Sequence, residues 1–139
     1  ELAEECSEAS PILNVDAEKL RTCFINVVAN AIQAMPEGGT MRIVFRRVVG
    51  DGSTVITFSD TGAGIEAGVV DHVFEPFFTT KREGIGLGLF LSKAIVETHG
   101  GTIDIGPNVD GPGTTVTFTF PPSAAADGHN HDAGLSAGR

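Results

Sequence analysis

The sequence predicts an α+β fold, with helices on one face of a mixed, mostly antiparallel sheet. Three observations favour this class. The chain has 139 residues, 41% of them hydrophobic, which suits one domain with a closed core. Its strand-like segments come as two pairs separated by turn residues, as hairpins do. Helical and strand patterns do not alternate strictly, so a doubly wound parallel sheet is not expected.

The first half of the chain predicts a helix followed by a hairpin. Residues 11–15 turn apolar after an acidic start and suggest a strand or a segment leading into the fold. Asp16 suits the N-cap of a helix over 17–35, which Pro-Glu-Gly-Gly ends. Segments 40–49 and 54–60 are rich in Val, Ile, Phe and Thr, with Gly-Asp-Gly-Ser between them. Two antiparallel strands are therefore expected.

The second half predicts the same order of helix and hairpin after an irregular loop. A short helix is expected over 66–73, and the glycines of FEPFFTTKREGIGLGL then indicate a loop. A second helix over 87–99 ends at two glycines, which suit a left-handed cap. Segments 102–105 and 114–120 form the closing strand pair, and Pro-Pro ends the fold.

One domain over residues 1–122 is expected, followed by a tail over 123–139 whose small polar residues are typical of disorder. The chain begins without Met. We therefore interpret it as a segment of a longer protein.

The net charge of −9 disfavours contact with nucleic-acid backbones and anionic membranes. No apolar run reaches the length of a membrane span, so this segment is expected to make no membrane contact. Cys6 and Cys23 form neither a C-x-x-C pair nor a disulfide framework, which suits a reducing compartment. We expect a cytoplasmic segment, with any membrane anchor in the remainder of the parent protein.

The first predicted helix carries a polar stripe. At 100° per residue, Asn26, Asn30 and Gln33 fall within an arc of about 60°. Much of the remaining surface is apolar, through Leu20, Phe24, Val27, Val28, Ala31 and Ile32. A buried amide without a partner costs about 1 to 3 kcal/mol. The stripe is therefore either an exposed strip on a half-buried helix or a surface that meets a polar partner or ligand.

An aspartate ends the second strand of the first hairpin. Asp60 is followed by Thr-Gly-Ala-Gly-Ile, and Gly62 and Gly64 allow the backbone to approach another group closely. A carboxylate at this position can accept a hydrogen bond from an amino group. The alternative is an Asx turn in which Asp60 only caps its own loop.

Three alternating glycines precede the second long helix. Gly84, Gly86 and Gly88 leave N–H groups free near a helix start, where the helix dipole favours phosphate. Lys81 and Arg82 add positive charge just upstream. The spacing fits neither a Walker A nor a Rossmann motif, so a flexible hinge is the alternative.

The amide stripe, the strand-end aspartate with its glycines and the glycines before the second long helix, in this order, supply the groups that bind a nucleotide with Mg²⁺. Together they resemble a known family. NVVANAIQAMP, DTGAGI and FEPFF are similar to the N box, first glycine box and F box of the ATP-binding catalytic domain of sensor histidine kinases. TTKREGIGLGLFLSKAIVETHGG resembles the ATP lid and second glycine box, and GTT with VTFTFP the last nucleotide-contacting strand. The superfamily includes gyrase, the heat-shock chaperone and MutL. The resemblance covers residues 15–121 and implies a two-layer, Bergerat-type sandwich that binds ATP and Mg²⁺.

The resemblance also assigns roles to residues. Asn30 supplies its side-chain oxygen to Mg²⁺, and Asn26, one turn earlier, is the second catalytic residue. Asp60 accepts from the adenine 6-amino group, and Lys81 reaches phosphate. Further nucleotide contacts are implied for Gly62, Gly64, Ile65, Phe77, Thr80, Gly84, Gly86, Leu87, Gly88, Leu89 and Thr114.

Gyrase-like and MutL-like members carry Glu where this chain has Asn26, so the resemblance favours a kinase over a hydrolase. It implies a nucleophilic His on a separate dimerisation domain and a response regulator receiver domain as the downstream partner. None of His72, His99, His129 and His131 is expected to be the acceptor or a metal ligand. The alternatives are an anti-sigma-type serine kinase or slow ATPase of the same superfamily, and a non-catalytic nucleotide-binding module.

Two departures from the family pattern concern the lid. Ile85 stands where the family more often has Thr or Ser, so one hydroxyl contact is lost and weaker affinity is expected. The lid over 79–85 is short. Together with PFFTTK before the glycine box, it resembles nitrogen-regulation-type sensor kinases.

Overall fold

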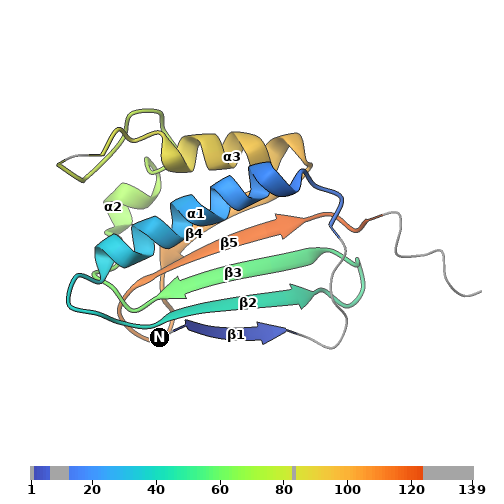
Figure 1. The fold of residues 1–139 in the computed structure, drawn as a ribbon, viewed down its shortest axis with the longest axis horizontal. Coiled ribbons are helices and arrows are strands. Elements are labelled where there is room, and N and C mark those ends of the chain that lie inside the picture. The colour runs from blue at the N-terminus through green and yellow to red at the C-terminus, as the bar shows by residue number, and fades with distance from the viewer. Residues whose placement is uncertain (1, 7–12, 83, 124–139) are drawn as a thin grey trace, which may run out of the picture.

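The computed structural model describes residues 2–6, 13–82 and 84–123, which form two layers. In chain order the elements are β1 (Leu2–Cys6), α1 (Ala17–Ala34), β2 (Met41–Arg47), β3 (Thr54–Asp60), α2 (Ala67–Val70), α3 (Gly88–Thr98), β4 (Thr102–Pro107) and β5 (Thr114–Phe120). Figure 1 shows α1 and α3 side by side on one face of the sheet. The predicted α+β class is confirmed.

The sheet has five strands in the order β1-β2-β3-β5-β4. β1 runs parallel to β2, and the other neighbours pair antiparallel, so the sheet is mixed and mostly antiparallel as predicted. Met41 lies opposite Asp60 in the β2–β3 register, and Ser59 lies opposite Thr115 in the β3–β5 register. The end of β3 therefore lies beside the start of β5.

Most predicted elements form within one or two residues of their expected bounds. The exception among the helices is the short one expected over 66–73, since α2 is a single turn, Ala67–Val70. His72 accordingly lies in the turn that follows α2 and not in a helix. No described helix has both the length and the apolar character needed to cross a membrane.

The strand β1 differs from the sequence prediction, which put a strand over 11–15. Of that segment, residues 13–15 form no strand, and 11–12 lie outside the described residues. The strand that does form, LAEEC, contains two glutamates, which have low strand propensity. Its pairing with β2 is a contact between distant parts of the chain, which no local pattern announces.

The core lies between α1, α3 and the inner face of the sheet. Phe24 of α1 packs on Phe58 of β3 and Phe118 of β5, with ring centroids 5.0 and 5.3 Å apart. Cys23 is fully buried beside them, and burial raises the pKa of its thiol. Ile32, counted with the apolar surface of the helix, is 62% exposed and lies outside this core.

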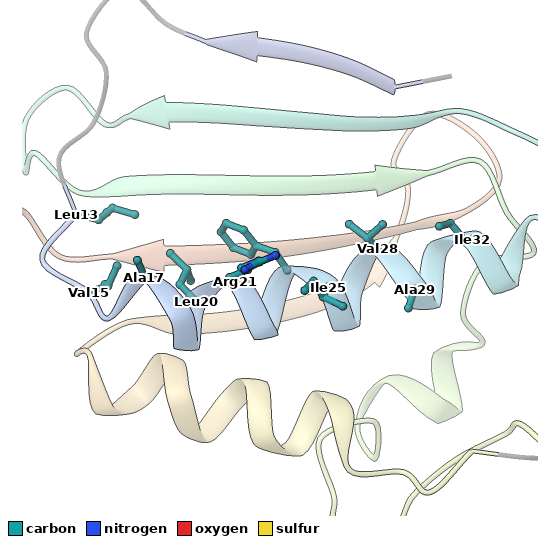
Figure 2. A pocket seen from close by; sticks show the side chains of 10 residues that line it. Leu13, Val15, Ala17, Leu20, Arg21, Ile25, Val28, Ala29 and Ile32 are labelled. Carbon is teal, nitrogen blue, oxygen red and sulfur yellow. The ribbon is translucent and has the colours of Figure 1, made fainter.

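A separate apolar groove runs along α1. Its volume is about 730 Å³. Figure 2 shows the side chains that line it, which are Leu13, Val15, Ala17, Leu20, Arg21, Phe24, Ile25, Val28, Ala29 and Ile32. None of the three amides of the polar stripe is among them. The groove and the stripe are therefore different surfaces of the same helix.

A histidine joins the start of α1 to the end of α3. The Asp16 N–H donates to Nε2 of His99 (3.1 Å), so this nitrogen is an acceptor. His99 Nδ1 therefore carries the proton and donates to the Ile95 carbonyl (2.7 Å). Asp16 caps α1 as predicted, because its Oδ1 accepts from the Glu18 and Lys19 N–H groups. Nε2 of His99 thus joins the start of α1 to the end of α3, while Nδ1 fixes the ring to α3 itself.

Candidate functional site

The polar stripe of α1 faces α3 and the loop that precedes it. The Asn26 amide nitrogen donates to the Gly88 carbonyl (3.3 Å) and to the Ser92 hydroxyl (3.4 Å). Ser92 is fully buried, so this contact satisfies a polar group inside the helix interface. Among the described residues, none donates to the Asn26 Oδ1. Asn26 therefore fixes the glycine-rich start of α3 against α1 and keeps one oxygen free.

The other two amides of the stripe bind the lysine of the lid. Lys81 Nζ donates to Asn30 Oδ1 (2.7 Å) and to Gln33 Oε1 (2.5 Å). The Lys81 N–H donates to the Thr79 hydroxyl (3.0 Å), which helps to shape the loop. Although Lys81 is exposed overall, the loss of water around its ammonium lowers the pKa of the lysine. The stripe thus meets a polar partner, which was one of the two interpretations, but the sequence did not identify Lys81 as that partner because the contact depends on the path of the loop.

Asp60 is buried at the end of β3, and its two carboxylate oxygens differ. Oδ1 accepts from the Gly62 N–H (2.9 Å) and from the Thr114 N–H (3.2 Å). No described residue donates to Oδ2, and no buried side-chain polar atom of the described residues lacks a partner. Oδ2 is therefore open to solvent. The Asx turn exists, and it leaves one oxygen able to accept from a further donor.

Glycines allow the backbone to pack tightly around Asp60. A Cβ on Gly113, whose φ is +107°, would lie 1.8 Å from the Asp60 carbonyl oxygen. A Cβ on Gly62 would lie 2.6 Å from the Ala34 carbonyl oxygen at the end of α1. Gly64, with φ +80°, lies against Gly113. The strand-end cluster, defined as Asp60, Gly62, Gly64, Gly113 and Thr114, is thus built mainly from backbone contacts.

Asn108 is a member of this region that the sequence reasoning missed. Its amide nitrogen donates to the carbonyls of Asp60 and Pro112 (both 2.7 Å), and its Oδ1 accepts from the Thr115 hydroxyl (2.6 Å). These bonds fix the loop before β5 to the end of β3. The available signal was an Asn five residues before Gly113 in a turn-rich loop, which indicates a turn and does not identify its partners.

The glycines before α3 have different local roles. Gly86 has φ +75°, and a Cβ there would lie 2.5 Å from the Phe77 carbonyl carbon. The Phe77 N–H donates to the Gly86 carbonyl (2.9 Å), so this glycine packs on the F-box segment. A Cβ on Gly88 would meet Asn26 at an ordinary 3.6 Å. Leu87, the N-cap of α3, makes no capping bond through its side chain, which leaves first-turn N–H groups available.

The structure joins most of the predicted site residues into two neighbouring groups. The stripe cluster, defined as Asn26, Asn30, Gln33, Lys81 and Gly88, is linked by the contacts above. The Ala63 N–H donates to the Ala34 carbonyl (3.1 Å), which attaches the strand-end loop to the same helix. The Gly84 N–H donates to the Lys81 carbonyl (3.3 Å), which adds Gly84 to the surroundings of the stripe cluster. Within the described part of the chain, the other predicted residues make no hydrogen bond to either cluster, namely Ile65, Phe77, Thr80, Gly86, Leu87 and Leu89.

The oxygen donors of the stripe suit one type of metal. Among the described residues, no group of three or more His, Cys, Asp or Glu side chains could hold a metal ion. Asn30 offers an amide oxygen, which Mg²⁺ accepts when phosphates and waters complete its six ligands. The residues present therefore fit a metal that arrives with a nucleotide, and they do not form a cage of their own.

Comparisons with known proteins agree with this arrangement. The family model described as histidine kinase-, DNA gyrase B- and HSP90-like ATPase matches residues 15–124. The signal transduction histidine-protein kinase AtoS of Escherichia coli (strain K12) is 38% identical over 120 residues, which are 86% of this chain and 19% of AtoS. The chain spans about a fifth of the length of the curated relatives it matches.

Solved structures give the same result. The catalytic domain of histidine kinase ThkA has a TM-score of 0.76 and 29% identity, over 86% of this chain and 77% of that one. Full-length ShkA in complex with AMPPNP has a TM-score of 0.75 and 27% identity, over 89% of this chain and 26% of that one.

Proposed function

This chain belongs to the histidine kinase-, DNA gyrase B- and HSP90-like ATPase family, and on that premise we propose that it is the ATP-binding catalytic domain of a two-component sensor histidine kinase. It binds ATP with Mg²⁺ and presents the γ-phosphate to a His on a dimerisation domain of the parent protein. The receiver domain of a response regulator then accepts the phosphoryl group. One observation carries the proposal: the stripe of α1, the end of β3 and the start of α3 are linked by direct contacts.

The strand-end cluster would bind the adenine base. Asp60 Oδ1 is held by two backbone donors, which orients Oδ2 as an acceptor for the 6-amino group. Guanine has an oxygen at this position, so two acceptors would face each other and the base would be rejected. Gly62 and Gly64 leave no side chain between the base and the loop.

The stripe cluster and the start of α3 would bind the phosphates. The first-turn N–H groups of α3 and the Lys81 ammonium supply positive charge, and Asn30 Oδ1 would hold Mg²⁺. The metal would neutralise charge that develops on the transferred phosphoryl group. Asn26 carries an amide and cannot take a proton from water, which favours attack by the external His nitrogen. That attack forms the N–P bond as the bond to ADP breaks.

Calorimetric titration with ADP and GDP, with and without Mg²⁺, tests the base-binding role. Asp60→Asn keeps an oxygen for the backbone donors and turns an amide N–H₂ toward the base. We expect ADP affinity to fall by about 10- to 100-fold and the preference over GDP to disappear. Asp104→Asn, on the exposed face of β4, is the matched control and should bind like the wild type. Equal affinity of the wild type for ADP and GDP would contradict the assignment of Asp60.

The parent protein tests the kinase assignment. Incubation with ATP labelled at the γ-phosphate should give acid-labile, base-stable phosphate, as phosphohistidine does. Acid-stable phosphate would indicate a serine kinase of the same superfamily.

A further inference from the structure

Lys81, in the lid, forms a hydrogen bond with the side-chain oxygen of Asn30, which is the oxygen that we assign to Mg²⁺. Lys81 Nζ donates to Asn30 Oδ1 (2.7 Å), and the same ammonium donates to Gln33 Oε1 (2.5 Å). Both acceptors are uncharged amides about one turn apart on α1, and the lysine comes from a loop 51 residues beyond Asn30. In the free protein a cation is therefore already bound at Asn30.

The lysine and a metal ion compete for this oxygen. Mg²⁺ binds oxygen at about 2.0 to 2.1 Å and retains several waters, which need the space around Asn30. Two cations at one amide also repel each other, because the amide brings no negative charge to compensate. Nucleotide phosphates change this balance, since they offer negative charge to both cations. The lysine can then leave the amides for a phosphate as the metal takes Oδ1.

Building on the proposed function, we propose that Gln33 is a positioning residue that, with Asn30, holds the Lys81 ammonium at the metal position until Mg²⁺ and nucleotide replace it. Within the described part of the chain, the only side-chain hydrogen bond of Gln33 is the one with Lys81. Gln33 therefore acts on the ligand through the lysine. The same contact holds the lid against α1 in the free protein.

The held lysine lowers apparent affinity, because the ligand binds only the molecules in which Asn30 is released. Gln33→Met keeps the length of the side chain and removes the acceptor. The lysine then has one amide partner, the held state is less populated, and Mg²⁺–ADP should bind about 3- to 10-fold more tightly. Gln33 is exposed, so the variant should fold, which circular dichroism would verify.

A double-mutant cycle distinguishes an effect through Lys81 from a direct contact with the ligand. Lys81→Met removes the competing ammonium, and in that background Gln33→Met should leave the affinity for Mg²⁺–ADP unchanged. Gln33→Met that changes affinity equally in both backgrounds would mean that Gln33 contacts the ligand itself. Gln33→Met without effect in the presence of Lys81 would also overturn the inference.

The lid of the nucleotide-free protein gives an independent measurement. Amide ¹⁵N relaxation at Lys81 and Gly84 should report an ordered lid in the wild type and lower order parameters in Gln33→Met and Lys81→Met. Arg82→Met removes the neighbouring lid cation and is the control, with order expected to match the wild type. If the lid order parameters of Gln33→Met equal those of the wild type, the inference is wrong, whatever the affinity of this variant for Mg²⁺–ADP. If the wild type fails to bind Mg²⁺–ADP, the proposed function fails, and lid order still tests the Gln33–Lys81 contact.

Discussion

The strand-end cluster and the stripe cluster are held by different chemical groups. Asp60 is 8% exposed, and its Oδ1 is fixed by backbone N–H groups of two separate segments. The stripe cluster depends on side chains, and an exposed lysine from a loop closes it. Thr114 belongs to β5 and Gly62 lies in the tight loop directly after β3, so neither donor can move without disturbing the edge of the sheet, whereas an exposed side chain changes rotamer freely. The sheet therefore preforms one cluster, and the other can rearrange when a ligand binds.

The largest expected effect is that of Gly113→Ala in the strand-end cluster. The added Cβ would collide with the Asp60 carbonyl oxygen at 1.8 Å, and φ +107° disfavours any L side chain. We expect the free energy of unfolding to fall by about 3 kcal/mol or more, measured by urea denaturation. Gly111→Ala is the control, because φ is also positive (+146°) but nothing lies within 4 Å. Equal losses in the two variants would mean that the collision is relieved and that the cluster is not rigid.

Gly88→Ala in the stripe cluster should separate binding from stability. The nearest neighbour of the new methyl group would be Asn26, at an ordinary 3.6 Å, and alanine is the better helix residue. Unfolding free energy should stay unchanged or rise by about 0.5 kcal/mol, while Mg²⁺–ADP affinity falls about tenfold because the methyl group would stand beside Asn26, where we propose that the phosphates bind. Gly68→Ala in α2, where nothing lies within 4 Å of the added Cβ, should change the unfolding free energy by a similar small amount and leave the affinity unchanged. Wild-type affinity in Gly88→Ala would exclude close phosphate approach at this residue.

The smallest expected effect is the pH dependence of the ion pair between His72 and Glu75, which precedes the lid in the chain. The hydrogen bond and charge of Glu75, whose Oε1 lies 2.8 Å from His72 Nδ1, raise the pKa of His72 above its usual 6.5. Because the folded-state pKa is raised, the stabilisation is complete below the unfolded pKa and is lost as pH rises through the folded value. Both groups are exposed, so solvent screens the pair.

Titration of the His72 ring by NMR checks this pair. Glu75→Gln should bring the pKa back toward 6.5. An unchanged pKa in that variant would show that Glu75 is not the cause.

Local patterns predicted much of the fold. Asp16 and the Pro-Glu-Gly-Gly sequence bounded α1 because capping and helix termination depend on neighbouring residues. The two hairpins followed from their turn residues and from strand segments rich in β-branched and aromatic residues. β1 could not be predicted, since its pairing with β2 joins residues about 39 positions apart and its glutamates argue against a strand.

The sequence predicted which residues form the site, but it did not predict the hydrogen-bond partners of these residues. Asp60 and the glycines are recognisable because few residues other than glycine tolerate such backbone angles and close contacts. The bonds of Lys81 to Asn30 and Gln33 depend on the conformation of a loop without periodicity. Asn108 resembles an ordinary turn residue until the loop before β5 folds back onto Asp60.

The β2–β3 turn lies at the end of the molecule opposite the lid (Figure 1). There the Val48 N–H donates to the Ser53 carbonyl (2.8 Å), and Val49 is fully exposed. Extra residues inserted at Val49–Gly50 would face solvent, and each doubling of the insert would add only about 0.6 kcal/mol of closure entropy. This turn is thus a suitable point for a fluorescent fusion or a surface tether in single-molecule work, because it leaves both clusters untouched.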